Sequence, residues 1–103
     1  MMRLPNQPEP VHTAVLLFGN TVRAGILHVL SKGPATRAEL SATLEVGEQS
    51  LARQIAMLEE NGIVDSKILP GQGRPTQHSL NPDRLKRFED LYADYIHGGS
   101  GRL

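Results

Sequence analysis

The chain has 103 residues, and its 11 basic residues balance its 11 acidic ones. This length suits one domain and is too short for two comfortable ones. Zero net charge argues against a broad positive surface of the kind that binds nucleic acid, and the absence of cysteine excludes disulfides and thiolate metal sites. No apolar run is long enough to cross a bilayer, and no secretory signal is visible. We therefore expect a cytoplasmic protein with no cofactor, no metal and no membrane partner.

The N-terminal third predicts an arm and two helices. Residues 1–10 contain three prolines and few apolar side chains, so we expect an extended, mobile arm. The apolar stretch from Val11 to Phe18 predicts a short first helix. Asn20 is a suitable N-cap for a second helix that runs to about Ser31, where a Gly-Pro pair follows.

Two helices separated by a tight turn are expected next. Thr36 and Glu39 match a capping box, in which each side chain satisfies the backbone amide of the other residue. The helix that they start ends at a turn over residues 45–47, and another helix is expected from Glu48 to Asn61. The apolar stripe of this second helix has helical spacing and consists of Leu51, Ile55 and Leu58.

A hairpin and a last helix complete the pattern. Residues 63–69 and 76–80 predict two strands, and the loop between them carries two glycines and two prolines. Asn81 and Pro82 suit the N-cap and the first position of a helix that ends at two glycines. We expect residues 98–103 to be a flexible tail.

The order of these elements predicts a mainly α fold with a small β-hairpin, a winged helix-turn-helix with extra N- and C-terminal helices. We expect one domain over residues 11–97, between the arm and the tail. In this layout one helix fits a major groove of DNA, and the hairpin reaches an adjacent minor groove or the backbone.

Four consecutive segments also resemble parts of one known family. An Asn cap, an Arg and an Ile-Leu pair stand within residues 17–27, and residues 37–44 and 49–64 have the look of a scaffold helix and of a recognition helix leading into a wing. Residues 71–75, Gly-Gln-Gly-Arg-Pro, are similar to a wing tip. The family is the ArsR-like winged-helix regulators. The resemblance covers roughly residues 13–97 and implies a transcription regulator that binds a pseudo-palindromic operator as a homodimer.

Two departures from the family bear on function. The paired cysteines of metal-sensing members are missing, which removes the best-known sensing chemistry. Ala56 stands where the family's recognition helix often has Lys or Arg, so a lower affinity for phosphate is implied. No small-molecule effector is assigned.

By position, the resemblance places polar side chains of the recognition helix in the major groove, the start of the scaffold helix beside a phosphate, and the wing tip on DNA. The residues of the recognition helix are Gln49, Ser50, Arg53 and Gln54. Those at the start of the scaffold helix are Thr36 and Arg37, and those at the wing tip are Gln72 and Arg74. Arginine reads guanine and glutamine reads adenine through paired hydrogen bonds. The alternative is that the helix residues form a solvated face and that the residues of the wing tip form a solubilising turn. Arg23 is either a structural ion-pair partner or a DNA contact.

The last helix has a broader apolar face than a small core requires. We expect a homodimer through the N- and C-terminal helices, and core packing is the alternative explanation. The residues of this face are Leu85, Phe88, Leu91, Tyr92, Tyr95 and Ile96.

Catalytic and metal-binding patterns are missing from the sequence. There is no phosphate-binding loop, no Gly-x-Ser-x-Gly and no His-Glu-x-x-His, so we expect no enzyme. The histidines are scattered, and Asp90, Asp94 and His97 favour a solvated edge of the last helix over a metal site. His28 lies among apolar residues, which predicts a packed side chain.

These inferences predict a sequence-specific regulator of transcription that binds double-stranded DNA, acting as a dimeric repressor. The alternative is a winged-helix module for protein–protein interaction without sequence-specific DNA binding. The neutral charge and the acidic residues of the second helix, Glu48, Glu59 and Glu60, favour that alternative.

Overall fold

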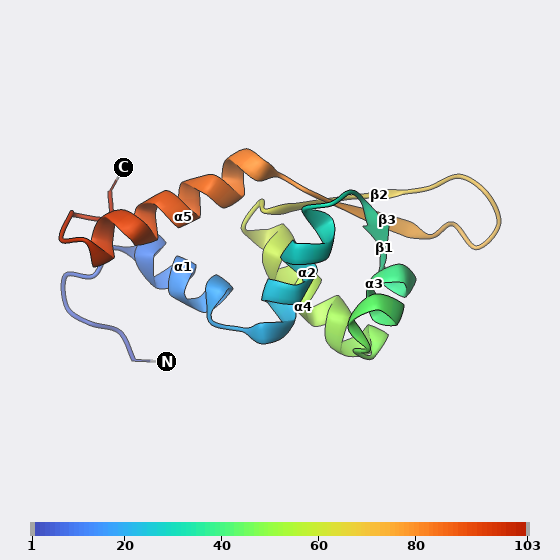
Figure 1. Ribbon diagram of the computed structural model, residues 1–103, viewed down its shortest axis with the longest axis horizontal. Helices are drawn as coiled ribbons and strands as arrows, with labels where there is room; N and C mark the ends of the chain where they lie inside the picture. The colour runs from blue at the N-terminus through green and yellow to red at the C-terminus, as the bar shows by residue number, and fades with distance from the viewer. Residues whose placement is uncertain (1, 103) are drawn as a thin grey trace.

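The computed structural model describes residues 2–102 and has an elongated shape of 50 × 24 × 19 Å. Both termini lie at one end of the long axis, beside α1 and the end of α5, and the hairpin projects from the opposite end (Figure 1). The elements in chain order are α1 (Glu9–Phe18), α2 (Thr21–Leu30), β1 (Ala35–Thr36), α3 (Arg37–Leu44), α4 (Glu48–Glu60), β2 (Val64–Ile68), β3 (Thr76–Leu80) and α5 (Pro82–Ile96).

The three strands form one antiparallel sheet in the order β1-β3-β2. β3 is central, and its His78 is the Cα partner of Ala35 on β1 and of Ser66 on β2. The hairpin of β2 and β3 is the wing. Its base is therefore fixed to the start of α3 through β1, while its tip extends beyond the body of the domain (Figure 1).

The helix-turn-helix unit encloses the core. Leu51, Ile55 and Leu58 of α4 are buried as their spacing predicted, and they pack with Leu40 of α3 and Ile26 of α2. Each such side chain gains roughly 1.5–3 kcal/mol on leaving water. The position of α4 is thus determined by its apolar stripe, which leaves the opposite side of the helix facing outward.

One glycine allows two of these helices to approach closely. A Cβ built at Gly25 of α2 would lie 3.1 Å from a methyl carbon of Leu44 on α3. This distance is shorter than an ordinary van der Waals contact, so an added methyl group would require the side chain of Leu44 to shift by a few tenths of an ångström.

The predicted helix caps are present. Asn20 accepts a hydrogen bond from the backbone N–H of Arg23 at 3.0 Å, and Asn81 accepts one from that of Arg84 at 3.1 Å. The capping box joins Thr36 N–H to a Glu39 carboxylate oxygen at 2.9 Å and Glu39 N–H to the Thr36 hydroxyl at 3.2 Å. These contacts satisfy amides that have no partner within their own helix. The predicted winged helix-turn-helix fold is confirmed.

The two ends of the chain depart from the expected arm and tail. α1 begins at Glu9, two residues before the expected domain boundary, because Pro10 in its first turn lacks the N–H that would be unsatisfied there. Gly101 is buried, and its N–H donates to a carboxylate oxygen of Asp94 at 2.9 Å. A Cβ at Gly101 would meet Val11 at 2.5 Å, so part of the expected tail packs on α1.

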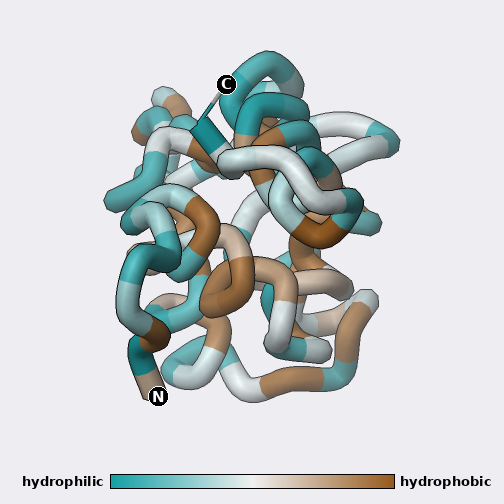
Figure 2. Tube along the Cα trace, turned by 90° about the vertical axis from the view of Figure 1, so that its left-hand side faces the viewer, coloured by the Kyte–Doolittle hydropathy of each residue, from teal (hydrophilic) through white to brown (hydrophobic). Residues whose placement is uncertain are grey.

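No single helix within residues 2–102 has the length and apolar composition needed to cross a membrane. α1 and α2 meet that test only when taken together, and they are bent by 84° to each other. Polar and apolar residues alternate along the helix turns at the end of the molecule that holds both termini (Figure 2).

Candidate nucleic-acid interface

The outer side of α4 is a polar surface long enough to lie in a major groove. The helix has 13 residues, which corresponds to about 20 Å at 1.5 Å per residue. Gln49, Arg53 and Ala56 are exposed on the side opposite the buried stripe, and Ser50 is half-buried at its edge. The structure thus brings three of the four sequence-predicted α4 residues onto or beside one outward face.

Arg53 is the only basic residue of α4. It forms no ion pair and no side-chain hydrogen bond with any other residue in the described part of the chain. A guanidinium carries five N–H donors and no acceptor. Arg53 therefore presents an uncommitted set of donors at the middle of the outward face.

The start of α3 lies next to the start of α4. Arg37 Nε is 3.5 Å from Glu48 Oε1, and both side chains are about half exposed. Thr36 is half-buried, and its hydroxyl oxygen already accepts the N–H of Glu39. Both predicted residues are present at this corner, but the charge of Arg37 is partly balanced by Glu48.

The loop of the wing reaches the same corner. Thr36, Arg37, Glu48 and Arg74 line one shallow recess between α3, α4 and the wing loop. Two arginines and two threonines, Thr36 and Thr76, therefore border a recess that also holds one carboxylate. These side chains can bind a phosphate if the positive charge of the two arginines exceeds the negative charge of Glu48.

The wing tip is an open turn that carries Gln72. Gly73 has φ +79°, and nothing lies within 4 Å of a Cβ built there, so the turn requires glycine for its backbone conformation and not for space. Arg74 follows with φ +38°, a left-handed value that is uncommon for a residue with a side chain. Gln72 is exposed and does not line the recess that contains Arg74.

Gln54 is placed differently from the other three predicted residues of α4. It is half-buried on the flank of α4 that faces α2, where its Oε1 accepts a hydrogen bond from Arg23 Nη1. Arg23 also donates to the backbone oxygens of Leu16 at 2.6 Å and Leu17 at 3.3 Å. Burial lowers the pKa of the Arg23 guanidinium. Arg23 thus links α1, α2 and α4 through hydrogen bonds to neutral acceptors, and it takes part in none of the ion pairs within residues 2–102.

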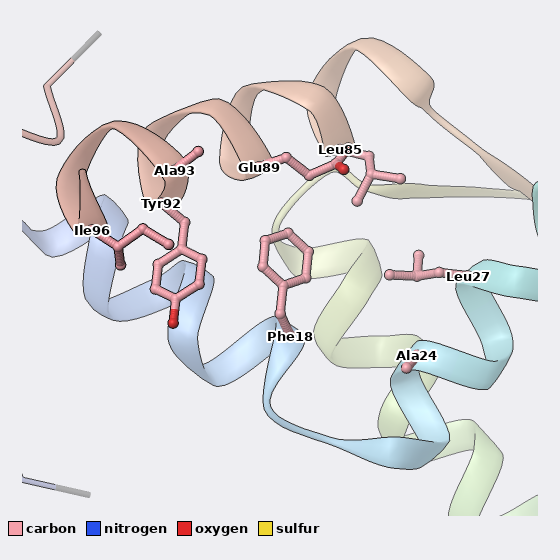
Figure 3. A pocket seen from close by; sticks show the side chains of 8 residues that line it. All are labelled: Phe18, Ala24, Leu27, Leu85, Glu89, Tyr92, Ala93 and Ile96. Atoms are coloured by element: carbon pink, nitrogen blue, oxygen red, sulfur yellow. The ribbon is translucent and has the colours of Figure 1, made fainter.

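An apolar cleft of about 520 Å³ separates α5 from α2 and the end of α1. Figure 3 shows the ring of Phe18 and the side chain of Leu27 facing Leu85 and Glu89 of α5 across this cleft. Its other lining residues are Ala24, Tyr92, Ala93 and Ile96. Glu89 is the only charged group among them.

The histidines do not form a site. Within residues 2–102 no three His, Asp or Glu side chains are grouped closely enough to hold a metal ion. His12 and His78 are the buried histidines, and the expectation that His28 is packed was wrong. At 100° per residue His28 lies on the side of α2 opposite the buried Ile26, so its apolar neighbours in sequence are not its neighbours in space.

Comparisons with known proteins agree with this geometry. A family model described as a helix-turn-helix domain matches residues 18–67. The reduced form of the transcriptional regulator YodB from B. subtilis is 26% identical with a TM-score of 0.65, covering 90% of this chain and 91% of YodB. An ArsR family transcriptional regulator is 25% identical with a TM-score of 0.64, covering 94% of both chains.

A third solved structure shares the fold at lower identity. The transcriptional repressor BigR from Xylella fastidiosa is 21% identical with a TM-score of 0.62, covering 81% of this chain and 83% of BigR. No curated protein matches the chain. The fold and the polar outer face of α4 define a winged helix-turn-helix protein. More narrowly, the chain is similar to ArsR-family winged helix-turn-helix regulators, as its sequence predicted.

Proposed function

We propose that this protein is a sequence-specific regulator of transcription that binds double-stranded DNA in the cytoplasm and has no catalytic role. The observation that carries the proposal is the outward polar face of α4, with Arg53 exposed and uncommitted at its centre. The names of the similar structures, a transcriptional regulator and a transcriptional repressor, support the same class of function.

In the proposed complex α4 lies in the major groove. Gln49, Ser50 and Arg53 contact base edges there, and Arg53 suits the paired acceptors of guanine. Gln54 joins them from the flank of the helix.

The recess beside α4 supplies the backbone contacts. Thr36, Arg37 and Arg74 surround one phosphate, and these contacts hold the protein in register without reading sequence. Gln72 extends along the groove from the wing tip. A neutral chain can bind DNA in this way because its few cations are placed at the contact points.

We propose further that the protein acts as a homodimer through α1 and α5. The apolar cleft lies between α5, the end of α1 and α2, and the exposed Met2, Leu4 and Ile96 belong to α5 or to the segment before α1. This end of the molecule is opposite the wing (Figure 1). Joining two copies there leaves both α4 faces free, doubles the number of placed cations and makes the second half-site contact intramolecular.

Selection from random double-stranded oligonucleotides, followed by sequencing, tests these proposals together. An enriched inverted repeat supports a sequence-specific dimer, and a single enriched half-site supports DNA binding by a monomer. The absence of any enriched motif rules out the sequence-specific function. Repression is then tested by transcription in vitro from a promoter that overlaps the selected site, where added protein should lower transcript yield.

A protein–protein interaction module is the second candidate, and the zero net charge favours it. Salt dependence separates the two. A DNA complex with about six phosphate contacts should give a log–log slope of the binding constant near −5. If binding to DNA is absent at low salt as well, the interaction module becomes the better explanation.

A further inference from the structure

The hydrogen bond between Arg23 and Gln54 determines which end of the Gln54 amide faces outward. A guanidinium has only donors, so the atom that faces it has to be the carbonyl oxygen Oε1. The chemistry of the partner thus removes the usual uncertainty in the orientation of a glutamine amide. The amide nitrogen Nε2 is therefore on the side away from Arg23.

Arg23 is itself held in place by two further acceptors. It donates to the carbonyl oxygens of Leu16 and Leu17, which belong to the last turn of α1. Such terminal carbonyls have no partner within their own helix. Turning the guanidinium away from Gln54 would also leave these oxygens without their donors, so Arg23 keeps the amide in one orientation.

Gln54 Nε2 has no partner within residues 2–102. Every buried side-chain nitrogen or oxygen in that part of the chain does have a hydrogen-bond partner. It follows that Nε2 is not buried. The donor is therefore accessible at the edge of the α4 surface that contains the exposed Arg53.

We propose that Gln54 contacts DNA as a donor only, that it selects a keto base, guanine or thymine, and that Arg23 is the positioning residue that imposes this choice. The inference rests on the proposed function. The usual pairing of glutamine with adenine requires Oε1 to accept from N6 while Nε2 donates to N7. Arg23 occupies one lone pair of Oε1 and places a positive charge beside the other, which disfavours a second donor such as adenine N6. Nε2 is therefore the atom left to contact the bases. Its acceptors in the major groove are O6 and N7 of guanine and O4 of thymine. N7 of adenine also accepts, but the adjacent N6 donor then faces no acceptor on Gln54, and cytosine offers only a donor.

The test compares the motifs that wild-type protein and three variants select from random double-stranded oligonucleotides. Gln54→Ala identifies the contacted position, because the base preference there should disappear. At that position the wild-type pool should carry G or T on one strand, with adenine depleted about fivefold or more, the lower end of the discrimination of a specific contact. In the Arg23→Met pool adenine should return, since the freed amide can turn to present both of its atoms.

Gln54→Glu keeps the partner of Arg23 but has no donor. Its melting temperature should stay within a few degrees of wild type, while the G/T preference is lost. Gln7→Glu is the matched control, because it makes the same change of charge in the segment before α1, away from the proposed DNA contacts, and should keep the preference at the Gln54 position. If Arg23→Met does not fold, Gln54→Glu still tests the donor-only contact of Gln54, because it leaves Arg23 intact.

The outcomes separate this inference from the proposed function. Adenine at the Gln54 position of the wild-type motif overturns the inference alone, and so does a Gln54→Ala motif identical to wild type. A folded Arg23→Met protein that keeps the G/T preference limits Arg23 to a structural role and overturns it too. If the wild-type protein enriches no motif, the proposed function fails and the inference fails with it.

Discussion

Arg37 at the start of α3 and Glu48 at the start of α4 face each other, with Nε and Oε1 3.5 Å apart. The pair lies at the recess that Arg74 borders from the wing. An exposed ion pair of this kind contributes only about 0–1 kcal/mol to stability. Its larger consequence concerns DNA, because a phosphate that approaches Arg37 has to compete with the carboxylate of Glu48.

Replacing Glu48 by glutamine should strengthen binding to DNA of any sequence. The change frees Arg37 and removes a negative charge from the interface, and 1 kcal/mol corresponds to an increase of about fivefold. Fluorescence anisotropy with a selected and a scrambled duplex measures the effect. Glu60→Gln, at the far end of α4, is the control and should change affinity less. Weaker binding of Glu48→Gln would mean that Glu48 itself accepts a hydrogen bond from a base.

Truncation of Arg53 should reduce specificity. Arg53→Ala removes the uncommitted guanidinium at the centre of the α4 face, and we expect a loss of about 1–3 kcal/mol on the selected site together with a relaxed preference at one base pair. Stability should change little because Arg53 is exposed. The measurement is a competition assay with single-base operator variants. Unchanged affinity for the operator would show that α4 does not read DNA with this face.

Truncation of Arg74 should act differently. This residue borders the phosphate recess between α3, α4 and the wing loop, so Arg74→Ala should weaken binding to all sequences alike. The log–log salt slope should become smaller in magnitude by about 1, because one phosphate contact is lost. Arg87→Ala, on the exposed side of α5, provides the comparison and should leave the slope as it is. A loss confined to one base preference would assign Arg74 to direct reading of a base.

A charge at Ile96 should separate the proposed dimer. Ile96 is 58% exposed at the end of α5, and an ammonium group buried in an interface there would lack a partner. Sedimentation equilibrium should show monomers for Ile96→Lys at concentrations where the wild type is dimeric. Ile68→Lys is a closely matched control, because Ile68 is 61% exposed but lies on the wing. Monomers for both variants, or dimers for both, would place the interface elsewhere.

Stability should fall in mild acid because of His78. Its ring nitrogen Nδ1 lies 2.7 Å from Ser66 Oγ, and burial is the main cause that lowers the pKa of His78; the charge of Arg37 acts in the same direction, and that of Glu59 opposes it. The folded state thus binds a proton less readily than the unfolded state, whose histidine titrates near about 6.5.

The contribution of neutral His78 is therefore complete above about pH 6.5 and is lost as the pH falls from there through the lower folded pKa. The slope for one proton is at most about 1.4 kcal/mol per pH unit. Urea denaturation between pH 5 and 8 measures it. His78→Gln should flatten the profile, whereas His28→Gln, at an exposed position, should not. An unchanged slope in His78→Gln would assign the acid sensitivity to another group.

The sequence alone determined the features that depend on near neighbours in the chain. The caps at Asn20, Thr36 and Asn81 each join residues three positions apart, and helix geometry fixes such contacts wherever the helix lies. The stripe of α4 likewise follows from its spacing. The order of capped helices and strands leaves few ways to bury these stripes, which is why the winged helix-turn-helix fold was predictable.

Only the tertiary structure decided which polar side chains remain free. Gln49, Arg53 and Gln54 look alike in sequence as polar residues of one helix, but Gln54 is bound by Arg23, which stands 31 positions earlier. Likewise, Arg37 acquires Glu48 as a partner only after α3 and α4 have packed. Contacts of this kind depend on the rotation and distance between helices, which arise from the packing of the whole core and have no local pattern in the chain.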